Sequence, residues 1–511
     1  MQQSVSDGVG QSLKTIVKGS GLIGAGMLFG SSLGYAYKLM LAWLGPEEFG
    51  IFSLCLTVLG VVTTVAFLGM RDGVVRYVGF YRGKGDSGRV KGTLQSVFSI
   101  GLSSSIVAGL MLVLLARPLA ETLFHDPSLA GYIRAFGLFV PLYVVHLLAI
   151  KGIMAFKQVK YRVYSYNLIW NVAKIGLTTL LLLLGFRLWG VIWGYGLALL
   201  VAGVSSVYFL EWKVFSFLRS SQQGVRNHME ILTYSTPLLF SGMAQLVLVW
   251  TDTLMLGYFT SLKEVGVYNV ALLVSSVIFL GSELLMPLYL PSISEMYGRR
   301  EEAGLAGLFH SVTKWIVTVS VPIFLLLALF PREVLGLLFP PSYLAASLAV
   351  VLLGGGRFIV AFAATSGSML KMAERTNRIF AIVSLAAVLN VLLNLVLIPR
   401  WGVEGAAFAT AISLAVQGGL FITSTQRFLD VSALNVTNLR VAAAAVVASL
   451  GLVALRSFVP LTGGWFLLSV CGFLLLYGLL LLAFRVVDGS DRIILAAVGR
   501  KLGLASLSVV E

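Results

Sequence analysis

The chain has 511 residues, of which 58% are hydrophobic and 12% are charged, and its mean hydropathy is +0.93. Soluble globular proteins carry about 25% charged residues, so this composition excludes a soluble protein and indicates one that crosses a membrane many times. The net charge of +15 does not indicate nucleic-acid binding, because the basic residues are distributed between apolar runs and form no basic domain.

Clusters of charged residues divide the chain into fourteen apolar runs, most of them about 20 residues long, which is the length of a helix that spans a bilayer. If the N-terminus is inside and the runs alternate, 27 of the 37 lysines and arginines lie in inner segments, 7 in outer segments and 3 within the runs. This asymmetry follows the positive-inside rule. It predicts a multi-pass protein with both termini in the cytoplasm, whose basic loops contact anionic membrane lipids.

The first apolar run, 19–44, contains one ionisable residue, Lys38. Gly26, Gly30 and Gly34 are spaced four apart, so they share one face of the predicted helix and allow a neighbouring backbone to approach closely. A short outer turn leads to the second helix, which ends at the first basic loop.

The third to sixth predicted helices follow with short connections. The fourth contains His146, an interior residue expected to find partners within the protein. The fifth carries Lys174 near its middle, and the sixth ends near Leu210. A predicted cytoplasmic linker, 211–230, separates this half of the chain from the next.

The second half of the chain repeats the first. Glu-Phe-Gly-Ile-Phe at 48–52 returns as Glu-Val-Gly-Val-Tyr at 264–268, and Trp-Gly-Val at 189–191 returns at 401–403. Each repeat contains six predicted helices. An even number returns the chain to its starting side, so the two repeats have the same orientation and are related by a pseudo-two-fold axis along the membrane normal.

The predicted fold is an all-α polytopic membrane protein with 14 transmembrane helices, arranged as two pseudo-symmetric six-helix lobes plus two C-terminal helices. We expect an N-lobe at 1–210 (helices 1–6), the linker at 211–230 and a C-lobe at 231–426 (helices 7–12). Residues 427–511 hold helices 13 and 14 and a cytoplasmic C-terminal tail.

Six ionisable residues fall inside the predicted helices. A charge at the bilayer centre costs from about 3 to over 10 kcal/mol when it faces lipid, so these side chains are expected to face a cavity or one another. Three cations against two acids leave a positive interior, which suits a phosphate or diphosphate held by charge-assisted hydrogen bonds. The six are Lys38, His146, Lys174, Asp252, Glu283 and Arg357.

Lys174 and Arg357 are the candidate substrate-binding cations. Arg357 directly follows three glycines, 354–356, which weaken a helix and expose backbone beside the guanidinium, as in the interrupted helices of transporter sites. The alternative is a small-residue packing patch whose arginine pairs with a neighbouring helix.

Three other ionisable residues are candidates for gating or ion coupling. Lys38 and Asp252 lie at similar depth in equivalent helices of the two repeats, so we hypothesise a salt bridge that closes the outer gate. Glu283, near the inner end of helix 8, either pairs with Arg71 or Arg76 or carries a proton or sodium ion.

Asn390 and Asn394 are one helical turn apart, so their amides share a face. They either join helices by hydrogen bonds or bind sugar hydroxyl groups.

Enzyme signatures are not found. The Gly-x-Gly-x-x-Gly at 19–24 follows a basic leader and not a strand, so it is no dinucleotide site. The sequence contains no zinc-protease, Walker, Cys-x-x-Cys or nucleophile-elbow motif. We therefore expect no catalytic residues, no metal site and no cofactor.

The duplicated lobes, the Glu-x-Gly-x-aromatic turn and the segment from Asn390 to Ala407, which contains Pro-Arg-Trp-Gly-Val-Glu-Gly-Ala-Ala, together resemble the polysaccharide transport family of the multidrug/oligosaccharidyl-lipid/polysaccharide exporter superfamily. The resemblance covers essentially the whole chain. It implies alternating access of a cavity lined by helices 1, 2, 7 and 8, in the cytoplasmic membrane of a prokaryote. It further implies a flippase that is not an enzyme and whose cargo is a polyprenyl-diphosphate-linked oligosaccharide.

The positive interior is compatible with such a cargo, Arg71 and Arg76 are placed to attract its diphosphate at the inner mouth, and helices 13 and 14 are suited to shaping a groove for its lipid tail. Related lipid II flippases carry several arginines in the first helix, where this chain has only Lys38. That difference argues against the peptidoglycan precursor as cargo.

Two other functions are alternatives, a multidrug exporter and a membrane glycosyltransferase or ligase. A cation-coupled multidrug exporter of the same superfamily would need an acidic cavity, which the positive interior disfavours. A membrane glycosyltransferase or ligase acting on the lipid-linked sugar would need a sizeable outer loop, and the longest outer segments, 117–131 and 331–343, are small for that.

Overall fold

The computed structural model describes residues 21–220, 223–298, 301–429, 431–433, 435–456 and 463–486. Within these ranges every regular element is a helix, which confirms the all-α class. Among the described residues, eleven helices are long and apolar enough to cross a membrane. The number 14 stays a prediction, and the tail after residue 486 lies outside the described residues.

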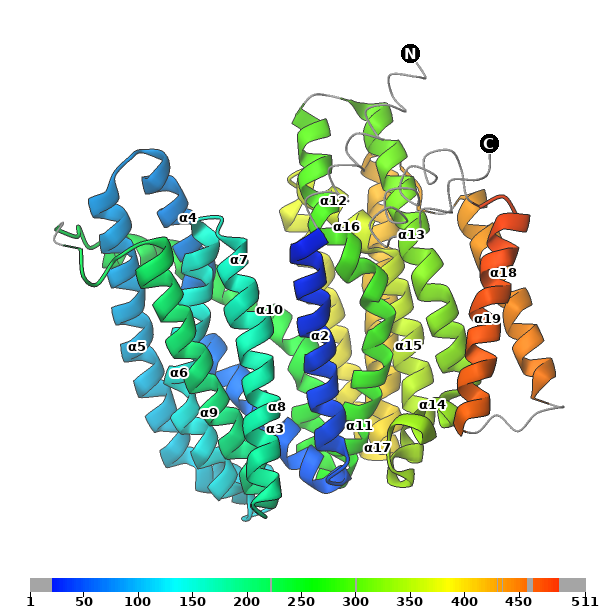
Figure 1. Ribbon diagram of the computed structural model, residues 1–511, viewed down its shortest axis with the longest axis horizontal. Coiled ribbons are helices and arrows are strands. Elements are labelled where there is room, and N and C mark those ends of the chain that lie inside the picture. Colours follow the sequence, from blue (N-terminus) through cyan, green and yellow to red (C-terminus); the bar gives the residue numbers. More distant parts are fainter. Residues whose placement is uncertain are drawn as a thin grey trace. The chain divides into compact units, whose positions relative to one another are not determined.

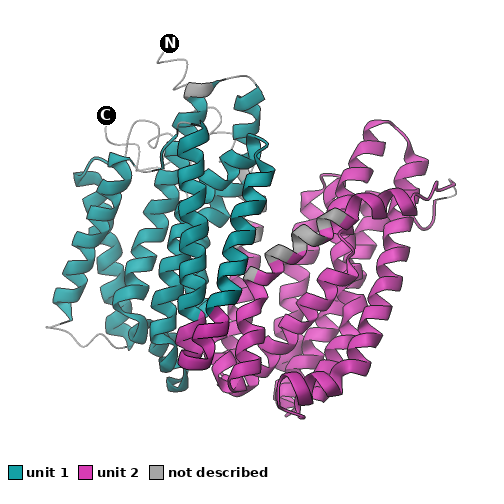
Figure 2. Ribbon diagram, turned by 180° about the vertical axis from the view of Figure 1, so that it is seen from behind, with its two compact units in different colours: residues 1–24, 270–393, 407–511 teal, residues 25–269, 394–406 magenta. Residues whose placement is uncertain are grey.

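The chain divides into two compact units, residues 25–269 with 394–406 and residues 1–24, 270–393 and 407–511 (Figure 2). We call them unit 2 and unit 1. Unit 2 contains α10 in addition to the helices of the first half, so its limits differ from those of the predicted N-lobe. The division into two six-helix lobes stays a prediction.

Unit 2 contains a long series of helices labelled in Figure 1. Several are interrupted by π-helical turns, here η1, η2 and η3. In chain order the elements are α2 (Gly21–Ala42), α3 (Pro46–Ala66), α4 (Met70–Gly83), α5 (Ser87–Pro118), η1 (Leu119–Leu123), α6 (Leu129–Ala155), α7 (Val159–Arg162), η2 (Val163–Ile169), α8 (Trp170–Leu183), α9 (Arg187–Tyr208), η3 (Phe209–Val214), α10 (His228–Phe259) and most of α11 (Leu262–Ser275).

Unit 1 contains the remaining helices, except that residues 394–406 of α17 belong to unit 2. They are η4 (Ser276–Phe279), a 3-10 turn, then α12 (Leu280–Gly298), α13 (Glu302–Leu329), α14 (Pro331–Leu338), η5 (Pro341–Ala346), α15 (Ser347–Phe362), α16 (Ala364–Met372), α17 (Thr376–Leu429), α18 (Val436–Leu455) and α19 (Gly463–Ala483). The 54-residue α17 consists of two helical segments, because Gly402 at φ 50° and ψ −123° breaks it. A left-handed φ of this kind favours glycine.

The glycine face of α2 packs on the fifth predicted helix. A Cβ at Gly30 would lie 2.6 Å from the Cβ of Asn167, and one at Gly26 would lie 2.6 Å from Val163. Gly34 faces the side-chain oxygen of Asn171. The predicted close approach is therefore confirmed, and its partner is the segment η2 to α8.

The repeated turn forms a contact between the two repeats. Gly50 lies at the start of α3, and a Cβ there would overlap the carbonyl oxygen of Leu262 at the start of α11. Reciprocally, a Cβ at Gly266 would overlap the carbonyl oxygen of Pro46. The two equivalent glycines thus allow two helix starts to meet backbone to backbone, all within unit 2.

From this contact α10 runs antiparallel along α3 and α4. Gly60 of α3 packs on the Trp250 ring, and Gly69 and Gly73 lie against Ser235. The first and last of these contacts are near opposite ends of α10, so the whole helix is joined to the first half of the chain.

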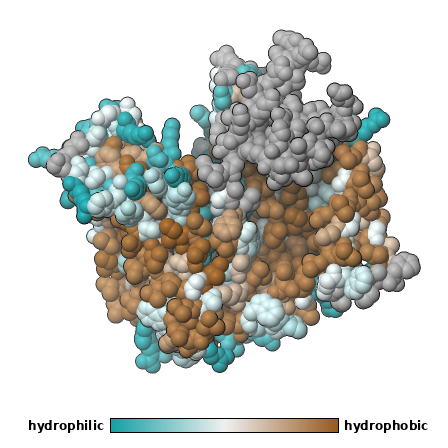
Figure 3. Space-filling model, in the orientation of Figure 1, coloured by the Kyte–Doolittle hydropathy of each residue, from teal (hydrophilic) through white to brown (hydrophobic). Residues whose placement is uncertain are grey.

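The surface fits a bilayer. Apolar residues cover the middle of the helices and hydrophilic ones gather toward their ends (Figure 3). Large apolar side chains such as Leu114, Leu183 and Leu475 are 71–81% exposed, which a protein in water would avoid on such a scale. The chain is a multi-pass membrane protein.

Candidate functional site

Lys174 of α8 lies among aromatic rings. Its ammonium is 4.6 Å from the centroid of Trp170 and 5.2 Å from that of Tyr37 in α2. The charge of Lys38 is its electrostatic neighbour. No carboxylate among the described residues pairs with Lys174. Ring faces attract an ammonium without occupying its N–H donors, so these donors are available to a ligand.

Buried polar atoms without a partner lie on the segment that carries Lys174 or against its Trp170, and of these residues the sequence analysis named only His146. Within the described part of the chain, Asn167 Oδ1, Trp170 Nε1 and His146 Nε2 are buried and lack a hydrogen-bond partner. Asn171 donates to the carbonyl of Asn167 at 2.7 Å. Buried polar groups are normally paired, so such a group of exceptions needs an explanation.

The signal for these residues was present in the sequence. Asn167, Trp170, Asn171 and Lys174 follow the helical spacing of i, i+3, i+4 and i+7, so they share one face. The π-helical turn η2 includes Asn167. Such turns are often found at functional sites, but no pattern in the sequence predicted this one.

His146 behaves as the interior residue that was expected. Its Nδ1 lies 3.1 Å from the carbonyl oxygen of Ala202 and 3.2 Å from Ser206 Oγ. Its ring is stacked on Tyr166 and lies edge-on to Trp170.

Arg357 of α15 lies in unit 1 and contacts a break in the neighbouring helix. It donates to the carbonyl oxygen of Leu272 and, at 2.9 Å, to Ser275 Oγ, where α11 passes into the 3-10 turn η4. The carbonyl oxygen of Ile278 in the same turn accepts from Ser320 Oγ at 2.9 Å. These contacts are those of an arginine paired with a neighbouring helix, which was the alternative interpretation. The role in substrate binding stays a proposal.

The glycines before Arg357 do not unwind the helix, because α15 is continuous from 347 to 362. Gly356 instead allows close packing, since a Cβ there would lie 2.8 Å from Ala411 Cα. The expected exposure of backbone beside the guanidinium is therefore wrong.

Arg71 and Arg76 are exposed on α4. The Arg76 guanidinium lies 4.0 Å from the centroid of Tyr234 in α10, and that of Arg71 lies 5.4 Å from Phe67. Stacking on aromatic faces leaves the edges of a guanidinium available for an anion. Their proposed attraction of a diphosphate stays a prediction.

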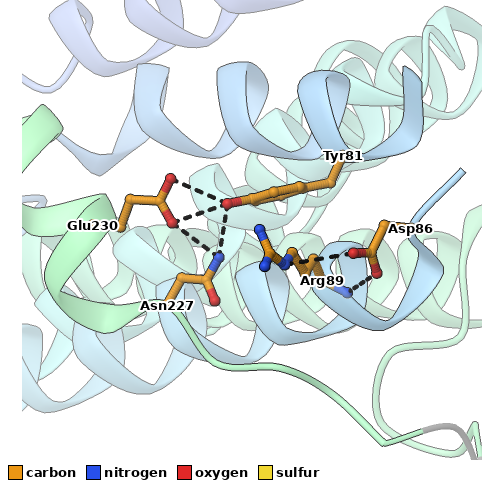
Figure 4. A network of polar contacts seen from close by, with 5 residues as sticks. All are labelled: Tyr81, Asp86, Arg89, Asn227 and Glu230. Carbon is orange, nitrogen blue, oxygen red and sulfur yellow. Dashed lines mark hydrogen bonds and ion pairs between the residues drawn. The ribbon is translucent and has the colours of Figure 1, made fainter. Parts of the chain in front are cut away.

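A polar network joins α4 to the start of α10 (Figure 4). The Tyr81 hydroxyl donates to the Glu230 carboxylate at 2.9 Å. The Asn227 amide donates to the Tyr81 hydroxyl at 3.0 Å and to Glu230 at 3.1 Å. Burial and the Glu230 carboxylate raise the pKa of Tyr81, so the hydroxyl stays protonated and donates.

The linker between the halves is docked on α5. The Glu211 carboxylate accepts from the backbone N–H groups of 217, 218 and 219 at 2.8 to 3.0 Å. Gln95 donates to the carbonyl of Phe217 at 3.1 Å. A Cβ at Gly92 would overlap the backbone of Val225. The linker is therefore an ordered strap across the first half, and we call 211–220 with 223–227 the linker strap.

Asp252 of α10 is 3% exposed. One of its oxygens accepts from the Tyr268 hydroxyl and the other from the Asn394 amide, both at 2.6 Å. All three residues belong to unit 2. A buried carboxylate hydrogen-bonded by a hydroxyl and an amide is a group that can bind a proton or a hard cation. The pairing of Asp252 with Lys38 stays a prediction.

The remaining candidates lie in unit 1. Asn390 is 1% exposed and donates to Thr410 Oγ1 at 3.0 Å, while Glu283 is exposed on α12. Both asparagines thus bond protein side chains, and a role toward sugar hydroxyls stays a proposal. No group of three or more His, Cys, Asp or Glu side chains in the described ranges is arranged to hold a metal ion.

Solved structures identify the class of fold. The lipid II flippase MurJ in an inward closed conformation is 15% identical, with a TM-score of 0.71 and coverage of 91% of this chain and 99% of that one. An inward-facing multidrug resistance MATE family transporter of the MOP superfamily is 15% identical, with a TM-score of 0.64 and coverage of 78% and 94%. The chain has the fold of these membrane transporters.

The family follows from the sequence itself. The family model described as polysaccharide biosynthesis protein matches residues 40–348, more than half of the chain, and the chain belongs to this family. The probable low-salt glycan biosynthesis flippase Agl15 of Haloferax volcanii is 23% identical over 416 residues, 80% of this chain and 82% of that protein. The probable flippase AglR of the same organism is 24% identical over 265 residues, about half of each chain.

Proposed function

We propose that this protein is a flippase that translocates a polyprenyl-diphosphate-linked oligosaccharide across the cytoplasmic membrane of a prokaryote for cell-surface polysaccharide assembly. The observation that carries the proposal is Lys174, an ammonium held by the ring faces of Tyr37 and Trp170 with no carboxylate partner among the described residues. A half-buried cation of this kind suits a diphosphate, because each N–H donor can form a charge-assisted hydrogen bond. A glycan biosynthesis flippase among the relatives and a lipid II flippase among the similar structures support a lipid-linked glycan as the class of cargo.

The proposed mechanism is alternating access. The lobes 1–210 and 231–426 rock against each other, and the 14 helices include two at the C-terminal end that hold the lipid tail. Arg71 and Arg76 attract the diphosphate at the inner mouth, Lys174 and Arg357 hold it during transfer, and Asn390 and Asn394 bind sugar hydroxyl groups.

Coupling to a proton or sodium gradient is assigned to Asp252, with Glu283 as a second acidic group. Support for Asp252 comes from its burial and from the hydroxyl and amide that bond its oxygens. Lys38 forms the outer gate with Asp252 in this scheme. A bound cation or cargo shifts the equilibrium between the two conformations only to the extent that it binds one of them more tightly than the other.

The test is translocation in proteoliposomes with purified protein, a fluorescent polyprenyl-diphosphate oligosaccharide and an impermeant probe of the outer leaflet. Wild type should flip the lipid, and Lys174→Ala should lower the rate at least about 100-fold, the effect of losing about 3 kcal/mol of charge-assisted hydrogen bonding. Lys263→Ala is the matched control, because Lys263 is an exposed lysine at the start of α11.

Two results would overturn the proposal. Sugar chains that lengthen without flipping would assign the protein to the membrane glycosyltransferases or ligases. Uptake of cationic dyes without flipping of the lipid would assign it to the multidrug exporters.

A further inference from the structure

The network between α4 and α10 holds the carboxylate of Glu230 by uncharged donors. Glu230 is exposed in the first turn of α10. Its oxygens accept from the Tyr81 hydroxyl at 2.9 Å and from the Asn227 amide at 3.1 Å (Figure 4). Among the described residues, no lysine or arginine pairs with this carboxylate. It is therefore held by hydrogen bonds that the oxygen atoms of another anion can also accept.

Two guanidinium groups lie on aromatic rings beside these donors. That of Arg89 is 5.3 Å from the centroid of the Tyr81 ring, and that of Arg76 is 4.0 Å from the centroid of Tyr234. Tyr234 follows Glu230 by four residues on α10, so the two share a face one helical turn apart. In the part of the chain that the structure describes, no carboxylate pairs with Arg76. Its guanidinium edge is therefore available to an anion.

The charge around the network favours a ligand more negative than a carboxylate. Residues 70–91, which include α4, carry six lysines and arginines against two aspartates. One of these aspartates, Asp86, lies 3.5 Å from Arg89. The single charge of Glu230 thus faces a segment with a net charge of +4. A diphosphate carries more negative charge than a carboxylate, so the field of this segment attracts it more strongly.

We propose that the Tyr81 hydroxyl and the Asn227 amide bind the diphosphate of the cargo, and that Glu230 is a resident anion that the diphosphate displaces. The predicted topology places α4 and the start of α10 on the cytoplasmic side, where the cargo enters. The inference rests on the proposed function and deepens it. To the attraction assigned to Arg71 and Arg76 it adds the donors that hold the diphosphate and the group that the diphosphate replaces.

The exchange of one anion for the other conserves the hydrogen bonds of the network. A phosphoryl oxygen accepts as a carboxylate oxygen does, so Tyr81 and Asn227 keep an acceptor. Because Glu230 is exposed, water solvates its carboxylate once it leaves. The first turn of α10 favours either anion through the helix dipole. A diphosphate has two phosphoryl groups, so one can occupy these donors while the other faces Arg76.

A purely structural contact between α4 and α10 is the alternative, and Tyr77 separates it from a binding site. Tyr77 lies one helical turn before Tyr81 on α4. Its hydroxyl donates to the main-chain carbonyl of the same Glu230 at 3.3 Å. Loss of either hydroxyl weakens the contact between the two helices, but only the hydroxyl of Tyr81 bonds the carboxylate. The two tyrosines are therefore matched variants.

The first test measures binding of geranylgeranyl diphosphate to the purified full-length protein. Glu230→Gln removes the competing charge and keeps an acceptor for Tyr81, so binding should tighten about tenfold, a gain that partial unfolding cannot produce. Tyr81→Phe should weaken binding about tenfold, as expected for the loss of a hydrogen bond to a charged group. Tyr77→Phe should leave binding unchanged. Glu47→Gln controls for net charge, because Glu47 is an exposed glutamate in the first turn of α3.

The second test separates the cargo from other sources of phosphate. Inorganic diphosphate should compete with geranylgeranyl diphosphate for the wild type, and Tyr81→Phe should weaken this competition. Inorganic diphosphate on both sides of the membrane should also slow flipping of the fluorescent lipid in proteoliposomes. Phosphatidylglycerol at the same concentration should not compete, because its phosphodiester carries a single negative charge.

Results of two kinds would overturn the inference. Weaker or unchanged binding in Glu230→Gln, or equal losses in Tyr77→Phe and Tyr81→Phe, would show a structural contact. Competition by phosphatidylglycerol would show a site for ordinary lipid headgroups, and inorganic diphosphate that binds without slowing flipping would show a site for free diphosphate. Wild-type flipping with binding unaffected by these variants would refute the site alone. Absent wild-type flipping would refute the proposed function, and the binding measurements would still decide the site.

Discussion

Lys174 and Arg357 are both cations inside apolar helices, yet their neighbours differ. Lys174 touches ring faces, which attract its charge and leave its donors available. Arg357 donates to Leu272 and Ser275 at a break in the adjacent helix. A charge in a membrane helix therefore indicates a polar neighbourhood, and the two neighbourhoods here differ in whether the donors of the cation are already hydrogen-bonded to protein.

The largest expected effect on stability is that of Arg357→Met. It should lower the free energy of unfolding by about 3 kcal/mol, because it leaves the Leu272 carbonyl and the Ser275 hydroxyl without this donor. Unfolding in mixed detergent micelles would measure it. Arg357→Lys should recover part of the loss, since one of the two contacts can be kept.

A smaller effect is expected for Ser275→Ala, which removes one acceptor of Arg357 and leaves the carbonyl contact. We expect a loss of about 1 kcal/mol in the free energy of unfolding. A double-mutant cycle of Ser275→Ala with Arg357→Met would give their coupling. Strict additivity would contradict the direct contact.

The smallest effect on stability is expected for Lys174→Met. The ring contacts of an ammonium contribute about 0.5–1 kcal/mol, so the free energy of unfolding should change by no more than that while flipping is lost. The same micelle unfolding measurement checks it. A loss of unfolding free energy as large as that of Arg357→Met would show that Lys174 has a structural role.

The sequence predicted the features that depend on composition and spacing. Apolar runs fixed the all-helical class, and the spacing of Gly26, Gly30 and Gly34 predicted a close helix contact that the structure places on η2 and α8. The repeated turn was recognised as a repeat, but its glycines also form a reciprocal contact that no local pattern encodes. Such a contact requires two segments more than 200 residues apart.

The features that depend on helix rotation and on long-range partners were not predictable. The spacing of Asn167, Trp170 and Lys174 was visible in the sequence, but no local pattern showed that Asn167 lies in a π-helical turn or that the Trp170 ring contacts the lysine. The glycines before Arg357 were interpreted as unwinding the helix, whereas they pack it. Glycine permits both an unwound helix and close packing, and here Gly356 packs against the backbone of Ala411.

The linker strap has a consequence for the order in which the nascent chain matures. Its backbone is held by Glu211, Gln95 and the surface around Gly92, all of which are synthesised before α10. The strap can therefore dock as soon as it leaves the ribosome, and α10 then enters the membrane beside an already formed α4. The first half of the chain thus serves as a template on which the first helix of the second half is assembled.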